Sequence, residues 1–251
     1  MISPENGVAA RVKRMLKNDN IIINHCLSHR LNLGTKDIWN QVKELSGFNS
    51  IIHCICWYFS QSYKRINILE EQEEEILGSH LKLIKPLDIR WLSIFKAISR
   101  IYEVYPALIN ALEVIAEQEG CVVAEGLLTR MKSLHFVSHL HIFQDLKSFL
   151  EPLNLLFQKQ HLKVADAFKE IEITIESLTE LTASERLGHF LHCFVSSNQN
   201  VSFSTFHNIQ LSNLYGYTLE SAQNQSKKFH HILLENLKTR FPSQKENLLQ
   251  S

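Results

Sequence analysis

The chain has 251 residues, enough for one large domain or two small ones, and its 26 Lys and Arg balance its 26 Asp and Glu. This balance excludes a global positive field that could hold a polyanion, so any nucleic-acid contact has to come from a local patch. Only 8 Gly and 5 Pro argue against a loop-rich β architecture.

The first two predicted elements are a basic helix and a strand. Apolar side chains recur at helical spacing over residues 7–16, and Arg11, Lys13 and Arg14 make this helix locally basic. A solvated helix face is the plain interpretation of these charges, and contact with phosphates is the alternative. Three consecutive isoleucines at residues 21–23 then predict a buried strand.

Two helices and an extended link come next. Residues 31–45 predict a helix that ends at the Ser-Gly pair after it. A second helix begins at about residue 49 and finishes in the acidic run 70–75, which we interpret as a solvated helix end or loop without a function. Residues 80–89 alternate apolar and basic side chains and include a proline, which predicts a short extended link.

The clearest helical pattern covers residues 94–115, where apolar residues alternate at four and three steps. Pro106 should kink this helix, and Gly120 should end it. Two further helices are expected at about 122–137 and 138–160.

The C-terminal part is also predicted to be helical. Residues 163–181 repeat the four-three pattern, and a last helix covers about 218–240. Residues 196–204 carry no apolar period and predict a loop or linker. One strand followed by seven or eight helices indicates a mainly α fold.

A compact group of Cys26 and His29 follows the predicted strand. Cys-x-x-His is half of a structural zinc site, and the nearest further candidates, at His53, Cys54 and Cys56, have no standard zinc spacing. A thiolate nucleophile at Cys26 is a second alternative, but no orienting partner is identifiable. We therefore expect no metal, and a strand–helix junction in which a hydrogen bond of His29 holds the turn.

Three histidines, His135, His139 and His141, form a second cluster. Residues four apart share a helix face and could bind metal, but no Glu stands between them as in His-Glu-x-x-His. We expect surface or helix-terminal histidines there. The chain also lacks Gly-x-Ser-x-Gly, a P-loop and Gly-x-Gly-x-x-Gly.

Arg90 and Trp91 stand at the start of the clearest helix. One interpretation is a structural anchor, with the indole buried and the guanidinium paired with a carboxylate. The alternative is a stacking surface with a phosphate contact for unpaired nucleic acid.

Several motifs, taken in order, resemble those of hAT-superfamily DNA transposases, and more closely those of domesticated, zinc-finger-associated hAT-like proteins of animal genomes. The first three are Gly-Val-Ala-Ala-Arg-Val-Lys, His-Cys-Leu-Ser-His-Arg-Leu-Asn-Leu and Arg-Trp-Leu-Ser, and two later stretches add support. They occupy residues 7–13, 25–33, 90–93, 152–160 and 236–242.

The resemblance implies a ribonuclease H-like domain interrupted by an all-α insertion. Residues 1–47 would then be an incomplete ribonuclease H-like α/β remnant, and residues 48–251 the helical insertion domain. The family's strand transfer needs two aspartates and a glutamate that hold two Mg²⁺ ions. None of Asp19, Asp37 and Asp88 matches that triad, so we expect a truncated chain that is not an enzyme, binds no cofactor and lacks the family's dimerisation segment.

We therefore expect a non-catalytic, transposase-derived protein that retains protein interaction, with partners unspecified, or weak DNA association. The DNA-contact candidates are Arg11, Lys13, Arg14, Arg90 and Trp91. Dispersed cysteines and the absence of a long apolar run favour the nucleus, or else the cytoplasm, and no membrane. The alternatives are a host nuclear DNA-binding, transcriptional or ubiquitin-like-ligase-type regulator, part of a longer hAT-like protein, or an enzyme completed by another chain's carboxylates.

Overall fold

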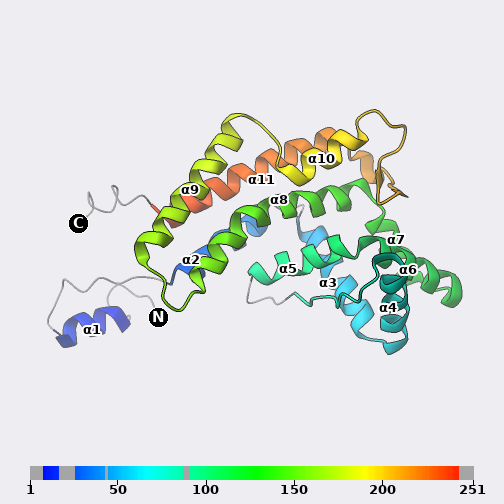
Figure 1. The fold of residues 1–251 in the computed structure, drawn as a ribbon, viewed down its shortest axis with the longest axis horizontal. Coiled ribbons are helices and arrows are strands. Elements are labelled where there is room, and N and C mark those ends of the chain that lie inside the picture. The colour runs from blue at the N-terminus through cyan, green and yellow to red at the C-terminus, as the bar shows by residue number, and fades with distance from the viewer. Residues whose placement is uncertain (1–7, 17–25, 43–44, 87–90, 243–251) are drawn as a thin grey trace.

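The computed structural model describes residues 8–16, 26–42, 45–86 and 91–242. Within these residues there are eleven α-helices, one short hairpin and a 3₁₀ turn (Figure 1). The mainly α fold class is thereby confirmed. The strand predicted at 21–23 lies outside the described residues, so the ribonuclease H-like remnant stays a prediction.

The helices range from nine to 24 residues in length. In chain order they are α1 (Val8–Leu16), α2 (Leu27–Gln41), α3 (Leu45–Ser60), α4 (Tyr63–Leu77), α5 (Trp91–Glu103), α6 (Tyr105–Glu119), α7 (Val122–Met131), α8 (Leu134–Phe157), α9 (Val164–Ala183), α10 (His189–Asn198) and α11 (Leu219–Arg240). The other elements are β1 (Thr205–Phe206), β2 (Ile209–Gln210) and the 3₁₀ turn η1 (Leu214–Gly216).

Helix α8 is the centre of the bundle. Every residue from Phe136 to Leu146 is buried, so all faces of this stretch are covered by other elements. Helices α2, α5, α7, α9, α10 and α11 pack against it. Figure 1 shows α8 crossing the middle, with α9, α10 and α11 along one side and α5 along the other. Helices α4, α6 and α7 continue the packing at one end.

The segments on either side of residue 47 share one hydrophobic core. Trp39 of α2 and Phe48 of α3 both stack on Phe143 of α8, with ring centroids 4.9 and 5.3 Å apart. Helix α2 also packs along α11, where Arg240 Nη2 lies 2.7 Å from Asp37 Oδ2. Helices α2 and α3 and the last helix, α11, therefore belong to the same packed body.

Two helix boundaries predicted in the N-terminal half are wrong. Helix α2 ends at Gln41, because Val42 takes an extended conformation (φ −117°, ψ 96°), and Gly47 lies inside the next helix. The stretch predicted as one helix from residue 49 is two helices that break just before Tyr63, which is 79% exposed. The polar Gln-Ser pair ahead of Tyr63 interrupts the helix, since such side chains favour turns over helix interiors.

The long helical pattern around Pro106 is also divided. Helices α5 and α6 break at Val104, because Pro106 has no N–H to donate and fits only the first turn of a new helix. Gly120, with φ of +58°, ends α6 as predicted. Helix α8 begins after Ser133 rather than at residue 138, and the Ser133 hydroxyl accepts the Phe136 N–H at 3.1 Å.

The helices predicted at 163–181 and 218–240 are confirmed by α9 and α11. Helix α10 was not predicted, and the last three residues of this helix are the first three of the predicted loop 196–204. The predicted loop is therefore wrong at its beginning. Leu191, Phe194 and Val195 do recur at helical spacing, so the signal for α10 was present in the sequence but only about two turns long.

A two-residue hairpin follows α10. Its strands β1 and β2 pair antiparallel, and His207 and Asn208 between them both have positive φ, of 49° and 62°. Positive φ at both central residues is the type I′ turn that suits the twist of short hairpins. Asn198 at the end of α10 supports it, because its Oδ1 accepts the Thr205 N–H at 2.7 Å.

Candidate functional site

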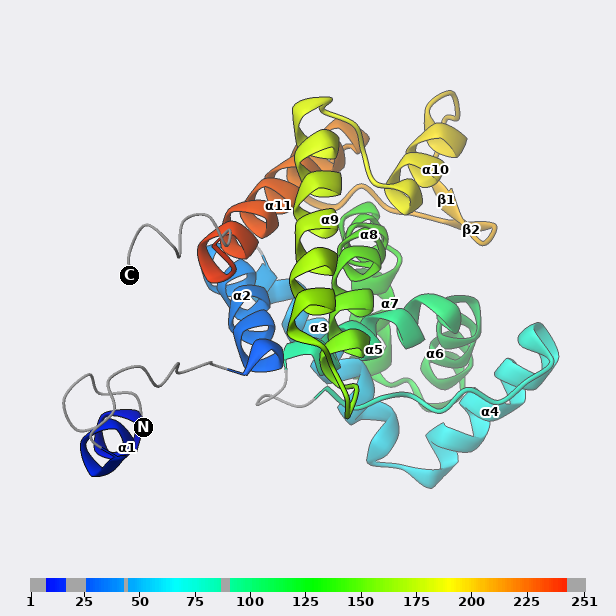
Figure 2. The same ribbon diagram turned by 60° about the vertical axis from the view of Figure 1, so that its left-hand side comes forward.

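A groove of about 380 Å³ lies between α3, α4 and the linking segment, residues 80–86. Its apolar lining comes from Phe59 of α3, Ile66 and Leu69 of α4, and Leu81 and Leu83 of the linking segment. Figure 2 shows α4 at the edge of the molecule, with the linking segment running back from its outer end towards α5. The groove is therefore open at the periphery of the bundle.

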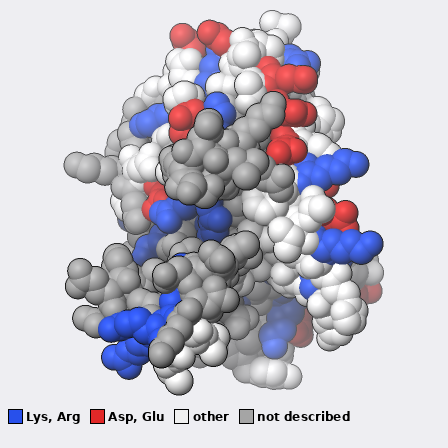
Figure 3. Space-filling view, turned by 90° about the vertical axis from the view of Figure 1, so that its left-hand side faces the viewer, with Lys and Arg blue, Asp and Glu red and all other residues white. Residues whose placement is uncertain are grey.

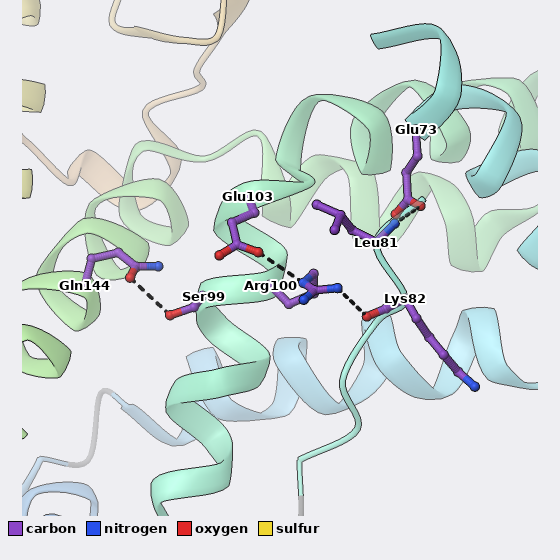
Figure 4. A network of polar contacts seen from close by, with 7 residues as sticks. All are labelled: Glu73, Leu81, Lys82, Ser99, Arg100, Glu103 and Gln144. Carbon is purple, nitrogen blue, oxygen red and sulfur yellow. Dashed lines mark hydrogen bonds and ion pairs between the residues drawn. The ribbon is translucent and has the colours of Figure 1, made fainter. Parts of the chain in front are cut away.

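The linking segment has neither helix nor strand hydrogen bonding over residues 80–86, which agrees with the predicted extended link. Side chains of three helices anchor its backbone instead. Cys56 Sγ of α3 donates to the Ile84 carbonyl at 3.4 Å. Arg100 Nη1 of α5 donates to the Lys82 carbonyl at 3.0 Å (Figure 4). The segment is thus fixed along the groove rather than loose.

The third anchor is Glu73 of α4, whose Oε2 accepts the Leu81 N–H at 2.9 Å (Figure 4). Glu73 is only 2% exposed, and its burial raises the pKa of this carboxyl above the ordinary value. Its other oxygen, Oε1, is buried without a hydrogen-bond partner. The acidic run 70–75 is therefore not merely a solvated helix end, since one of its members supports the groove.

Helix α5 is itself held on both sides of the Arg100 anchor. Arg100 Nε lies 3.1 Å from Glu103 Oε2, which orients the guanidinium towards the linking segment. At the residue before Arg100, the Ser99 hydroxyl donates to Gln144 Oε1 of α8 at 3.1 Å (Figure 4). This polar network links the groove to the centre of the bundle.

The outer rim of the groove on α4 is acidic. Glu70, Glu71, Glu74 and Glu75 are all exposed, and they line an open hollow of about 530 Å³ beside the groove. Glu74 Oε2 lies 3.3 Å from Nε2 of His80, which lines both hollows. The other rim, on the linking segment, carries Lys82 and Lys85.

The cysteine of the groove is not a nucleophile. Burial raises the pKa of the Cys56 thiol to about 12, so it stays protonated and serves as a hydrogen-bond donor. His53 is half-buried and Cys54 is exposed on the same helix. Across the described residues, no three or more His, Cys, Asp or Glu side chains are grouped so that they could hold a metal ion.

Cys26 and His29 open α2. Cys26 is its N-terminal cap, but only the Cys26 carbonyl bonds into the helix, to the Arg30 N–H at 3.0 Å. Both side chains are exposed, and His29 has no hydrogen-bond partner among the described residues. The preceding side of the junction, residues 17–25, lies outside the described residues.

The DNA-contact candidates fall in two places. Arg11 and Arg14 are exposed on α1, with Lys13 half-buried between them. Arg90 lies outside the described residues, and Trp91 is the first residue of α5. Figure 3 looks at the side on which α1 lies, and shows Lys and Arg gathered low on this face and mixed charges above.

The expectation of surface histidines is wrong for two of the three on α8. His139 is 0% exposed and His141 is 3% exposed, whereas His135 lies in the first turn of the helix. The rings serve as aromatic packing groups: His141 stacks on Phe194 at 4.4 Å and His139 on Phe48 at 5.2 Å. Burial lowers the pKa of His141 to about 4, so it packs as a neutral ring.

No family model matches the chain, and no solved structure matches it. Among the described helices, none is both long enough and apolar enough to cross a membrane.

Proposed function

We propose that this chain is a non-catalytic protein-interaction domain of transposase origin, and that the groove between α3, α4 and the linking segment receives a segment of a partner protein. The observation that carries the proposal is the combination of an apolar lining with a rigidly anchored backbone segment. Apolar clefts with a few fixed polar groups are the usual form of binding sites, because burial supplies affinity and polar groups supply orientation.

The surface beside the groove supports the same role. Trp57, at the end of α3, is 56% exposed, and Tyr63, at the start of α4, is 79% exposed. Arg65 of α4 lies over the Tyr58 ring of α3, 4.0 Å from its centroid. Trp, Tyr and Arg are the residue types that contribute most to binding energy at protein interfaces.

The ordered motifs that resemble hAT-like proteins support transposase origin, together with the all-helical body expected for the family's insertion domain. None of the three aspartates weighed against the family's triad matches it, and of these three only Asp37 lies among the described residues. Its carboxylate pairs with Arg240 at 2.7 Å, so it is engaged in packing α2 against α11. The nucleus remains our proposed location, on the same resemblance.

A display selection tests the proposal. Random peptides displayed on phage are selected on the full chain, and enriched peptides are then measured by fluorescence anisotropy. Ser60 lines the groove and is exposed, so Ser60→Trp should fill it with little effect on folding. Ser50 is an exposed serine on the same helix outside the groove, which makes Ser50→Trp the matched control. We expect binding to survive in the control and to be lost in Ser60→Trp; equal binding in both contradicts the proposal.

Weak DNA association is the second candidate, favoured by the basic residues exposed on α1. Removing two phosphate contacts should reduce the slope of log K against log salt by about 2. The variant is Arg11→Gln with Arg14→Gln, and the control is Lys163→Gln with Lys169→Gln at exposed positions around the start of α9. An unchanged slope in the α1 variant removes this candidate.

A further inference from the structure

We infer that the groove takes an extended, lysine- or arginine-rich peptide that pairs its backbone with the linking segment. The inference rests on the proposed function and specifies the occupant of the same groove. Three features carry it: backbone groups at Leu83 and Lys85 without a partner among the described residues, a lining that suits alternating side chains, and an excess of carboxylates on the rim.

The bundle binds the linking segment through the Leu81 N–H and through two carbonyls on the opposite side of its backbone. The carbonyls of Lys82 and Ile84, two residues apart, both accept hydrogen bonds from the body of the bundle. In an extended chain the backbone groups of successive residues point in opposite directions, so those of Leu83 and Lys85 lie on the side where the Leu81 N–H meets Glu73 of α4. Both residues line the groove, and neither has a backbone hydrogen-bond partner within the described part of the chain.

A peptide strand laid in the groove would satisfy these groups. Adding a strand to an exposed backbone edge is a general mode of peptide recognition, in which main-chain hydrogen bonds give affinity and pockets for alternate side chains give specificity. Here Phe59, Ile66 and Leu69 form an apolar wall opposite the linking segment. Every second side chain of an extended peptide would face that wall, so these positions should be apolar.

The charges on the two rims of the groove indicate which side chains suit the other positions of the peptide. On the α4 rim, Glu70, Glu71, Glu74 and Glu75 are exposed, whereas the opposite rim carries only Lys82 and Lys85. The excess of carboxylates favours a cationic peptide over an acidic one. This complementarity distinguishes the occupant from a simple apolar helix.

Glu73 adds an independent indication of a ligand. It is 2% exposed and lines the groove, and its Oε1 lacks the hydrogen bond that a buried carboxylate oxygen normally has. A donor brought by the peptide, either a backbone N–H or a lysine ammonium, would supply that bond.

The test uses the full chain and three labelled synthetic peptides. The first is Ac-Lys-Val-Lys-Ile-Lys-Val-Lys-NH₂, the second replaces every Lys by Glu, and the third is the first with N-methylated amides at its apolar residues. N-methylation removes the N–H donors that strand pairing requires while it preserves charge and side chains. We expect measurable binding of the first peptide only. Equal binding of the acidic or the N-methylated peptide overturns the inference.

Charge reversal on the protein provides the second arm. Glu71 and Glu75 are exposed and four apart on α4, and Glu172 and Glu176 are exposed and four apart on α9. Replacing both Glu71 and Glu75 by Lys should lower the affinity for the basic peptide by about tenfold. This is the size expected when two exposed ion pairs become repulsions. Replacing both Glu172 and Glu176 by Lys should leave the affinity for the basic peptide unchanged. If no designed peptide binds while selected peptides are still lost in Ser60→Trp, the inference fails and the proposed function stands.

Discussion

Gly188 leaves the space that the Asp145 carboxylate occupies. A Cβ atom on Gly188 would collide with the Asp145 carboxyl group. The carboxylate, from the middle of α8, accepts the Phe190 N–H at 2.8 Å and the Leu191 N–H at 3.1 Å, so it caps the first turn of α10. One glycine and one buried carboxylate thus fix the start of α10 to the centre of the bundle.

Replacing Gly188 by Ala should therefore destabilise the fold. The added methyl group forces Asp145 away from the α10 amides, and overpacking of this kind costs about 2 kcal/mol. Urea unfolding followed by circular dichroism measures the change. Gly126→Ala is the control, since a Cβ there meets nothing within 4 Å inside helix α7, and it should stabilise by up to about 1 kcal/mol. Equal stability of the two variants would contradict the packing described.

Acid should destabilise the protein through its buried histidines. Burial lowers the pKa of His139 to about 3 and those of His141 and His230 to about 4, against 6.5 in the unfolded chain. As the pH falls through 6.5, the unfolded chain therefore takes up protons that the folded chain refuses. Asp145 acts in the opposite direction, because burial raises its pKa to about 6 from 3.8.

For these four groups the free energy of unfolding at pH 5.5 should be roughly 3 kcal/mol below that at pH 7.5. Urea titrations at the two pH values measure the difference. His139→Phe keeps a ring against Phe48 and removes one titrating group, so it should reduce the difference by about 1 kcal/mol. A stability independent of pH over this interval would show that the histidines are not held neutral.

The pair of Asp37 and Arg240 should couple the two ends of the chain. Both side chains are partly exposed, so a double-mutant cycle with Asp37→Asn and Arg240→Gln should give a coupling of about 0.5 kcal/mol that weakens in high salt. Both variants should still unfold in a single transition, since α2 and α11 share one core. Independent unfolding of residues 26–42 would contradict this arrangement.

Arg100 should control the order of the linking segment. In Arg100→Met the Lys82 carbonyl loses its donor, so backbone amides of residues 80–85 should exchange with deuterium faster than in the parent chain. Arg130→Met, at an exposed position on α7, is the control and should leave that exchange unchanged. Equal exchange in both variants would mean that Arg100 does not hold the segment.

Local pattern predicted most helices because their apolar stripes are long and face a common core. The prediction from local pattern failed where one or two residues decide whether a helix continues or ends. Pro106 does more than kink a helix, since a new helix, α6, starts there. Polar residues before Tyr63 separate α3 from α4, although one apolar stripe runs through both helices. The buried state of His139 and His141 was missed although the sequence carried a sign of it, since apolar neighbours on every side of a helix are the pattern of a buried helix.

The groove could be predicted only in part. The extended link was visible as alternating residues around a proline, and the acidic run was visible as charge. What joins them is tertiary: Glu73 turns inwards from that run to hold Leu81, and Arg100 reaches the Lys82 carbonyl from a helix that begins beyond the link. Neither contact follows from the spacing of residues along the chain.

The central claim, a peptide-binding groove between α3, α4 and the linking segment, is tested most directly by hydrogen–deuterium exchange of the full chain with and without the basic peptide. The account predicts slower exchange at the Leu83 and Lys85 amides, and none of this protection in Ser60→Trp. Protection elsewhere in the described chain with residues 80–86 unchanged would contradict it.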